Sequence, residues 1–457
     1  MSKFAKIVLF FICIPFALNA GKGYGFRVYL KDKGASEYNV DQPEQFLSKE
    51  ALERRVRQGI EITFSDLPIA QSYLDTLILA GGKPIVQSKW LCTVVVSMED
   101  SITIQRVEQL AIVDSVKWIW SGKKEQRPEI DIDTSLLITL NKPLDSYYGY
   151  ATEQIKMLNG VKLHDSGYKG EGMTIAVIDA GFMNVDRIVA FDSLKLLGTR
   201  NMVDPGKSVF REDDHGTKVL SCLAANIPGI MVGTAPAANY WLIKSEDTLS
   251  EYPIEEDYWV AALEFADSVG VEVISSSLGY FTFDRDELNH HPSELDGNTS
   301  IASRAASIAA DKGVLIFCSA GNEGANTWGK ITFPADARNI LTVGAITEKK
   351  EKSTFSSVGL TADYRMKPDV VALGTASCVI DYNGQIRLVN GTSFSTPIVA
   401  GLGICLWQAL PQLSNKDIIK LIQQSSNLYK RPNIELGYGI PNMYKAYKWK
   451  RKHGKTR

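Results

Sequence analysis

The stretch that decides the fold of this chain is GTSFSTP at residues 391–397, and the apolar run IVAGLGI follows it. Small residues around Ser393 predict a tight turn, and the apolar run predicts a buried helix. Pro397 suits the first position of that helix, because the N–H that proline lacks has no helical partner there. Ser393 is then either an ordinary helix cap or, with backbone N–H groups around it, a nucleophile beside an anion-binding site.

Three further motifs distinguish between these two interpretations. Asp179 ends the buried-strand pattern TIAVID. His215 begins the apolar helical pattern HGTKVL, and Asn322 lies in SAGNEG after the apolar run GVLIFC. Each motif alone is weak evidence, because aspartate caps helices, histidine lies on surfaces and asparagine occupies turns. The order aspartate, histidine, asparagine and serine along one chain favours a serine nucleophile with its own base.

On these motifs the chain resembles the subtilisin-like serine peptidases, or subtilases, over residues 148–447. The resemblance also rests on three short stretches, which are FPA at residues 333–335, KPDVVA at residues 367–372 and GYGIP at residues 437–441. The chain departs from the family at three positions. The family usually has threonine or serine at the first position, often has a second histidine at the second, and usually has proline at the third. These positions are Ala180, Lys218 and Leu373. None of them removes a proton-transfer group, so the resemblance still implies an active peptidase.

The resemblance implies catalytic roles for Asp179, His215 and Ser393. Ser393 would attack the peptide carbonyl and form an acyl-enzyme, and His215 would accept the proton of its hydroxyl. Asp179 would orient the imidazole and stabilise its charged form. The side-chain amide of Asn322 and the backbone N–H of Ser393 would stabilise the oxyanion of the tetrahedral intermediate. The expected substrate is a protein or peptide.

Two backbone segments resemble those with which the family lines its substrate cleft. They are Ser277, Leu278 and Gly279, and Ser319, Ala320 and Gly321. Glycine lets an extended peptide approach the backbone and pair with it as a strand. The alternative is that both segments are plain ends of core strands.

The expected chemistry requires no cofactor, and the sequence identifies no metal ligands. An insertion at residues 280–299 carries five acidic residues, which are Asp284, Asp286, Glu287, Glu294 and Asp296. Because these oxygen donors cluster, a structural calcium site is one interpretation of the insertion. A solvated loop that walls the cleft is the other.

Residues 21–121 are predicted to form a separate small α+β domain of ferredoxin-like type. Strand patterns lie at residues 26–30, 83–91, 93–97 and 116–120, and helical patterns at residues 47–59, 70–79 and 101–110. In the first of these helices, the apolar residues expected on one buried side are Leu47, Ala51, Leu52 and Val56. Secreted subtilases commonly carry such a domain as a propeptide that assists folding and then blocks the cleft. The resemblance therefore implies an intramolecular inhibitor, with a permanent accessory domain as the alternative.

The rest of the chain divides into a linker, a large domain and a tail. The polar residues 122–147 contain KKEQRP and are predicted to be a linker and a cleavage zone. Residues 148–447 alternate apolar strands with helices, which predicts a subtilisin-like α/β domain with a parallel sheet flanked by helices. Strands are expected at residues 174–179, 240–244, 271–277, 313–319, 340–345 and 369–373, and helices at residues 255–268 and 300–311. Residues 448–457 form a basic tail.

The N-terminus has the pattern of a secretory signal peptide. Lys3 and Lys6 precede an apolar run at residues 7–20, which is too short to span a bilayer comfortably. We therefore expect a signal peptide at residues 1–20 and a secreted or periplasmic protein.

Composition excludes several other classes of protein. The 457 residues have a net charge of −2, and 22% of them are charged, which is ordinary for a soluble globular protein. We therefore expect no nucleic-acid partner, and no later segment is a convincing membrane span. The six cysteines form no Cys-x-x-Cys pair, which favours buried free thiols over a metal or redox site.

The function that these observations favour is an exported serine endopeptidase, made as a self-processing precursor. The alternative is a non-catalytic binding or regulatory protein on a subtilase fold, and the complete set of motif residues argues against it. An esterase of α/β-hydrolase type is excluded, because that fold requires Gly-x-Ser-x-Gly and the order serine, aspartate, histidine.

Overall fold

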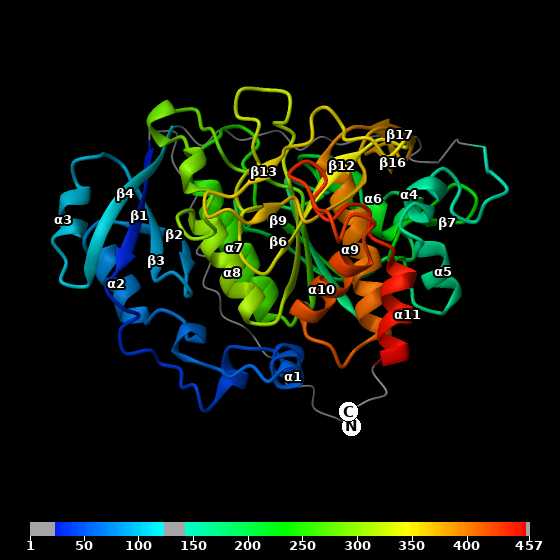
Figure 1. Ribbon diagram of the computed structural model, residues 1–457. Helices are drawn as coiled ribbons and strands as arrows, with labels where there is room; N and C mark the ends of the chain where they lie inside the picture. The colour runs from blue at the N-terminus through cyan, green and yellow to red at the C-terminus, as the bar shows by residue number, and fades with distance from the viewer. Residues whose placement is uncertain (1–22, 123–141, 454–457) are drawn as a thin grey trace.

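The computed structural model describes residues 23–122 and 142–453, which form an N-terminal unit and a larger domain that lie against each other (Figure 1). The expected signal peptide lies outside the described residues. Most of the expected linker and the end of the basic tail also lie outside them.

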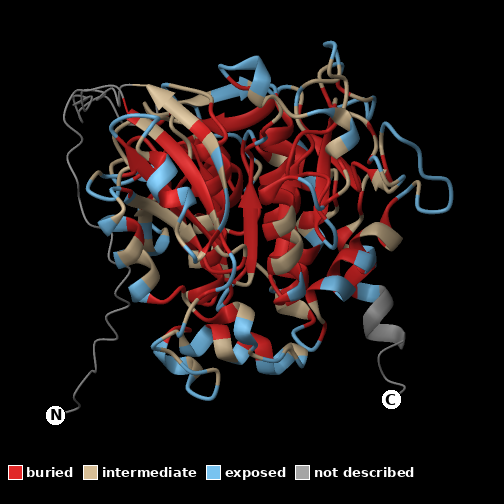
Figure 2. Ribbon diagram, turned by 90° about the vertical axis from the view of Figure 1, so that its left-hand side faces the viewer, coloured by how far each residue is buried: buried red, intermediate tan, exposed pale blue. Residues whose placement is uncertain are grey.

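A seven-stranded parallel sheet forms the centre of the larger domain. In the order in which they pair, its strands are β15 (Val370–Leu373), β12 (Leu341–Ile346), β11 (Leu315–Ser319), β10 (Val273–Ser276), β5 (Thr174–Asp179), β9 (Asn239–Lys244) and β6 (Lys195–Asn201). Along β5, Ile175 and Val177 enter one hydrophobic core, and Ala176 and Ile178 enter another. Both faces of the sheet are therefore buried, as Figure 2 shows, and the predicted subtilisin-like α/β architecture is confirmed.

The edge strand β6 is not predicted by the sequence pattern. Most of its residues are exposed or half-buried, and it pairs with β9 alone. A continuous apolar run marks only a strand that is covered on both faces, so an exposed edge strand gives no such signal.

Helices cover both faces of the sheet (Figure 1). α6 (His215–Ala224) and α9 (Thr392–Ala409) contribute to the core that holds Val177, whereas α7 (Ile254–Ser268) and α8 (Ile301–Asp311) contribute to the core that holds Ile178. The other helices are α4 (Thr152–Lys156), α5 (Gly160–Asp165), α10 (Asn415–Ser425) and α11 (Met443–His453). Three two-stranded ladders complete the domain: β7 (Asn226–Ile227) with β8 (Met231–Val232), β13 (Gly359–Leu360) with β14 (Met366–Lys367), and β16 (Ser377–Ile380) with β17 (Ile386–Val389).

Helix α9 begins at Thr392, so Ser393 lies inside its first turn and Pro397 inside the helix. The expectation that Pro397 takes the first helical position is therefore wrong. A proline within a helix removes the hydrogen bond to the carbonyl four residues earlier, which here is the carbonyl of Ser393. The Ser277 hydroxyl donates to that carbonyl at 2.8 Å instead. This bond ties the segment after β10 to the start of α9.

The N-terminal unit contains a four-stranded antiparallel sheet with the order β2-β3-β1-β4. Its elements along the chain are β1 (Gly23–Leu30), α1 (Lys49–Gln58), α2 (Gln71–Leu79), β2 (Lys83–Ser88), β3 (Thr93–Met98), α3 (Ile104–Glu108) and β4 (Val113–Gly122). One face of the sheet packs on α2 and α3, and the other packs on the first turns of α7. This arrangement confirms the predicted small ferredoxin-like domain.

Helix α1 lies apart from this sheet, below the larger domain in the view of Figure 1. Leu47 and Ala51 are buried as expected, but Val56 is 80% exposed, so that part of the prediction is wrong. Arg54 and Arg55 are buried in its place, each 1% exposed. The physical reason is Asp267 of the larger domain, a buried carboxylate that pairs with the arginines of this helix.

The buried arginines of α1 meet the end of α7. Arg54 donates to the Asp267 carboxylate and to the Val271 carbonyl, each at 2.5 Å. Arg55 pairs with Asp267 at 2.8 Å and with Asp66 at 3.3 Å. Asp267 is fully buried, and the two cationic side chains that pair with it both come from the N-terminal unit.

Charged and polar contacts join the N-terminal unit to the rest of α7 as well. In the first turn of α7, Asp257 forms an ion pair with Arg27 at 2.6 Å. Further along, the Glu264 carboxylate accepts hydrogen bonds from the Ser88 hydroxyl and from the backbone N–H of Lys89 and Trp90. The N-terminal unit is thus bound along the whole length of this helix.

Candidate active site

Asp179 and His215 form an ion-paired contact at one edge of the central sheet. Asp179 is the last residue of β5 and is fully buried, whereas His215 is the first residue of α6 and its side chain is 33% exposed. Asp179 Oδ1 lies 2.6 Å from His215 Nδ1. Burial opposes the charged imidazole, but the Asp179 carboxylate outweighs it and raises the pKa of His215 above its ordinary value. The geometry suits a histidine that accepts and returns a proton.

The residue after Asp179 is alanine, where the family usually has threonine or serine, and this affects the hydrogen bonds of the Asp179 carboxylate. The backbone N–H of Ala180 donates to Oδ1 at 2.8 Å, but Oδ2 is buried and has no hydrogen-bond partner among the described residues. Ala180 has no hydroxyl that could donate to Oδ2, whereas threonine or serine would have one. Fewer donors on the carboxylate leave more of its charge to act on the imidazole.

Ser393 lies in the first turn of α9 and is 6% exposed. Its hydroxyl donates to the Ser277 carbonyl at 3.3 Å, which is a long hydrogen bond. The ring of the next residue, Phe394, lies 5.9 Å from the ring of His215. The structure therefore joins His215 to Asp179 directly, and it places the residue that follows Ser393 beside His215.

Asn322 is held by a residue that the sequence reasoning missed. Its Oδ1 accepts hydrogen bonds from the backbone N–H of Thr392 at 2.9 Å and from the Thr392 hydroxyl at 3.0 Å. Both contacts fix the amide so that Nδ2 is the atom left to donate to another group. Thr392 immediately precedes Ser393, so the amide is positioned beside the serine. Thr392 belongs to the motif at residues 391–393, but its contact with Asn322 can be recognised only in the folded structure.

The first expected substrate segment lies at the same edge of the sheet. Ser277 and Leu278 are buried and follow β10, whereas Gly279 is exposed. A Cβ atom at position 279 would lie 2.2 Å from the Thr332 hydroxyl oxygen. The packing of Thr332 therefore requires glycine at this position, whether or not a peptide also approaches the backbone here.

The second expected segment follows on the neighbouring strand β11. The Ser319 hydroxyl donates to the Leu278 carbonyl at 3.4 Å, so the two segments touch. The backbone of Ala320 is occupied within the protein, because its N–H donates to Val343 and its carbonyl accepts from Thr332. Gly321 has φ of +101° and would place a Cβ atom 2.9 Å from the Ser357 hydroxyl, which explains the glycine.

A cleft of about 540 Å³ opens beside these residues. It is lined by Ala180, His215 and the segment 277–279, together with the loop after β9 and the start of α7. A cleft of this size can hold part of an extended peptide chain.

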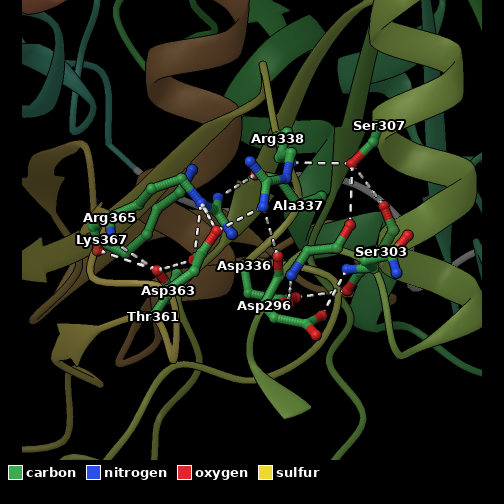
Figure 3. Close-up of polar contacts among 12 residues, drawn as sticks. Asp296, Ser303, Ser307, Asp336, Ala337, Arg338, Thr361, Asp363, Arg365 and Lys367 are labelled. Carbon is green, nitrogen blue, oxygen red and sulfur yellow. Dashed lines mark hydrogen bonds and ion pairs between the residues drawn. The ribbon is translucent and has the colours of Figure 1, made fainter. Parts of the chain in front are cut away.

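Asp296 of the insertion and the neighbouring Asp336 and Asp363 form polar contacts within the protein (Figure 3). Asp296 accepts from the backbone N–H and the hydroxyl of Thr299, and Asp336 accepts from the Gly297 N–H at 2.7 Å. Asp363 forms an ion pair with Arg338 at 2.6 Å. In residues 23–122 and 142–453, no group of three or more His, Cys, Asp or Glu side chains is arranged to hold a metal ion. The calcium interpretation of the insertion stays a prediction.

Two further predictions concern the cysteines and membrane-spanning segments. The five cysteines in the described part of the chain are free, and four of them are buried, as predicted. Within the same ranges, no helix combines the length and the apolar character that a membrane crossing requires.

Comparison with known proteins gives matches for both parts of the chain. The model of the subtilase family matches residues 170–439, and that of the peptidase S8 propeptide domain of Bacteroidota matches residues 25–131. Subtilisin NAT of Bacillus subtilis subsp. natto is 27% identical over 301 residues, which are 65% of this chain and 70% of that protein. Subtilisin Savinase of Lederbergia lenta is 28% identical over 281 residues, which are 61% of this chain and 92% of that protein.

Proposed function

The chain belongs to the subtilase family, and from that premise we propose that it is an exported serine endopeptidase that cuts its own precursor. Family membership and the N-terminal propeptide domain support a serine peptidase made as a precursor. The proposal adds three points: the residues that perform the chemistry, the self-processing, and the export of the protein.

In the proposed mechanism, Ser393 attacks the peptide carbonyl while His215 takes the proton from its hydroxyl. Asp179, at 2.6 Å, holds the imidazole in the required tautomer and stabilises its positive charge. The tetrahedral oxyanion accepts from Asn322 Nδ2 and from the Ser393 backbone N–H. His215 then gives its proton to the leaving amine, and water hydrolyses the acyl-enzyme by the same steps. Side chains and backbone perform all of this, so no cofactor is required, and activity should survive a chelator in short assays.

The single observation that carries this proposal is the set of contacts around the start of α9. His215, paired with Asp179, has its ring 5.9 Å from the ring of Phe394, and Asn322 is bonded to Thr392, so the contacts involve the two residues that flank Ser393 in the chain. In the described geometry, the Ser393 hydroxyl donates to Ser277. The proposed mechanism requires this hydroxyl to turn toward the imidazole, and catalytic hydrogen bonds are often long until substrate binds.

The N-terminal unit is proposed to act as a cleavable inhibitor. Its last strand, β4, ends at Gly122, and the polar linker begins at that point. We propose that a cut between residues 122 and 147 separates a signal peptide (1–20) and propeptide (21–121) from a mature domain (148–447) with its basic tail (448–457). An exported precursor of this type would be secreted or periplasmic.

The test is labelling of the purified protein with a fluorophosphonate, followed by intact-mass analysis. We expect one adduct on the wild-type protein and none on Ser393→Ala. Ser395→Ala is the matched control, because Ser395 lies two residues away and its hydroxyl is already bonded to the Thr392 carbonyl. Failure of the folded wild-type protein to react would favour the non-catalytic alternative.

A further inference from the structure

The stretches FPA, KPDVVA and GYGIP have no role in the proposed mechanism, yet the fold brings them together. The Thr342 hydroxyl donates to the carbonyl of Ala335, in the first stretch, at 2.6 Å. The backbone N–H of Asp369, in the second stretch, donates to the Thr342 carbonyl at 2.8 Å, and the Asp369 carbonyl accepts from the N–H of Tyr438, in the third, at 2.7 Å. The three stretches therefore gather around Asp369.

The ammonium group of Lys367 lies at the centre of this region. Lys367 is the last residue of β14 and is only 4% exposed. Its Nζ donates to Asp369 Oδ2 at 2.7 Å, to the Thr342 hydroxyl at 2.9 Å and to the Ile340 carbonyl at 3.2 Å. An ammonium group has three N–H donors, so each donor has one oxygen acceptor.

The three oxygens have the composition of a cation site. They are a carboxylate, a hydroxyl and a backbone carbonyl, and oxygens of these types bind hard cations in proteins. The contacts of 2.7, 2.9 and 3.2 Å are those of hydrogen bonds from an ammonium, because calcium requires oxygens at roughly 2.3–2.6 Å. The single carboxylate supplies one negative charge, which one ammonium neutralises. Both the spacing and the charge therefore suit an ammonium ion.

The fold holds the carboxylate in place independently of the lysine. Asp369 Oδ2 also accepts from the backbone N–H of Thr342 at 2.8 Å, and Oδ1 accepts from the side-chain amide of Gln423 at 2.9 Å. Thr342 lies in β12 and Gln423 in α10. Because these donors remain when Lys367 is replaced, we expect the oxygens to keep their positions.

This cluster lies at the edge of the central sheet opposite the proposed triad. Ile340 directly precedes β12 and Asp369 directly precedes β15, whereas Asp179 is the last residue of the parallel strand β5. A change at Lys367 should therefore act on the stability of the domain through the starts of two strands.

We propose that Asp369, Thr342 and the Ile340 carbonyl form a structural cation site in which the Lys367 ammonium takes the place of a metal ion. Once the lysine side chain is removed, the same oxygens bind a free primary ammonium ion. The built-in cation joins β12 to β15 without depending on the supply of ions outside the protein. This inference is independent of the proposed function.

The test measures the apparent melting temperature of the full chain in a Ser393→Ala background, which prevents self-cutting. Lys367→Ala removes the ammonium and its aliphatic stem, and n-butylammonium replaces both. Because a buried carboxylate loses its cation, we expect the melting temperature to fall by at least about 5 °C. About 100 mM n-butylammonium chloride should restore at least half of that loss, since a ligand that binds only the folded state stabilises it.

A second variant keeps the test decisive if Lys367→Ala does not fold. Lys367→Met retains most of the stem and leaves room only for a small cation. Ammonium chloride should therefore raise its melting temperature more than tetramethylammonium chloride does at the same concentration, because tetramethylammonium has no N–H donor.

Two controls separate binding at the site from a general effect of the additives. For Lys367→Ala, 1-butanol has the same carbon chain as n-butylammonium without the charge, and it should restore nothing. Val343→Ala is the matched protein control, because Val343 is a buried residue of the same strand β12 and has no contact with the ammonium. Its loss of stability should not respond to n-butylammonium.

Three results would overturn the site. The first is a Lys367→Ala chain as stable as its parent. The second is equal restoration of Lys367→Ala and Val343→Ala by n-butylammonium. The third is the absence of any stabilisation of the two Lys367 variants by their ammonium ions beyond that given by 1-butanol and tetramethylammonium chloride.

Discussion

Replacing Arg54 by methionine should weaken the binding of the N-terminal unit to the peptidase domain by roughly 100- to 4,000-fold. Arg54 is 1% exposed, and it donates at 2.5 Å both to the Asp267 carboxylate and to the Val271 carbonyl. Removal of one partner from a buried ion pair costs about 3–5 kcal/mol. Each 1.4 kcal/mol is about a tenfold change in a binding constant, which gives the stated range. Arg55 still pairs with Asp267, so we expect the lower half of that range.

The substitution should act on binding and leave the unit itself folded. Both hydrogen-bond acceptors of Arg54 lie in the peptidase domain, and methionine has nearly the same helix propensity as arginine. Lys49→Met is the matched control on the same helix. Lys49 forms an exposed ion pair with Glu53, and such a pair contributes about 1 kcal/mol or less. Its loss should change binding by less than about fivefold.

The assay is a titration of mature wild-type peptidase with the separately produced unit, residues 21–122, in three versions. Circular dichroism of each version checks that it is folded. If Arg54→Met inhibits within threefold of the wild-type unit, the buried pair does not hold the complex and the reasoning is refuted. Lack of inhibition by the wild-type unit, well above the enzyme concentration, would instead favour a permanent accessory domain.

Four predictions concern the candidate active site. Ser393→Ala should abolish hydrolysis and leave the precursor uncut, and a pure preparation that still matures by mass spectrometry would exclude self-processing. Asn322→Ala should lower kcat far more than it weakens substrate binding, by roughly 10²–10³-fold, the effect that loss of one such donor has in subtilisin; an unchanged kcat at equal folded fraction would exclude this role. Activity should rise with pH as His215 loses its proton, with an apparent pKa above 6.5, because only the neutral imidazole accepts the serine proton; a profile without an acid limb would contradict it. Ala180→Ser should move that limb to lower pH, because a hydroxyl donor to Asp179 weakens its hold on the imidazolium, and a shift to higher pH would count against this reasoning.

The central strands and the proposed triad could be predicted because their signals are local. β5 is covered on both faces, so it reads as a continuous apolar run that ends in Asp179. His215 and Ser393 each stand at the start of a helix, within a short motif of small residues. Asp179 ends a strand of the parallel sheet, and the order of the three motifs along the chain predicts that His215 and Ser393 meet it at that edge.

The parts that could not be predicted depend on partners far away in the sequence. Asp267, more than 200 residues later in the chain, determines which side of α1 is buried. The apolar pattern of α1 alone therefore predicted wrongly that Val56 is buried. Thr392 gains its role from Asn322, which lies 70 residues earlier. The cleft beside His215 is lined in part by the loop after β9, which is bonded to α7 through Asp247 and Glu255, and no local sequence pattern indicates that contact.

If the linker is cut as proposed, contacts along the whole length of α7 would make the departure of the N-terminal unit an event separate from the cut. Cleavage of one peptide bond ends only the covalent tether, and with it the high effective concentration of the unit. The pairs at Asp257, Glu264 and Asp267 remain after the cut and must all be rehydrated before the unit leaves. The lifetime of such a nicked complex would then set the interval between synthesis and activity. A second molecule that digests the released unit would make the end of that interval irreversible.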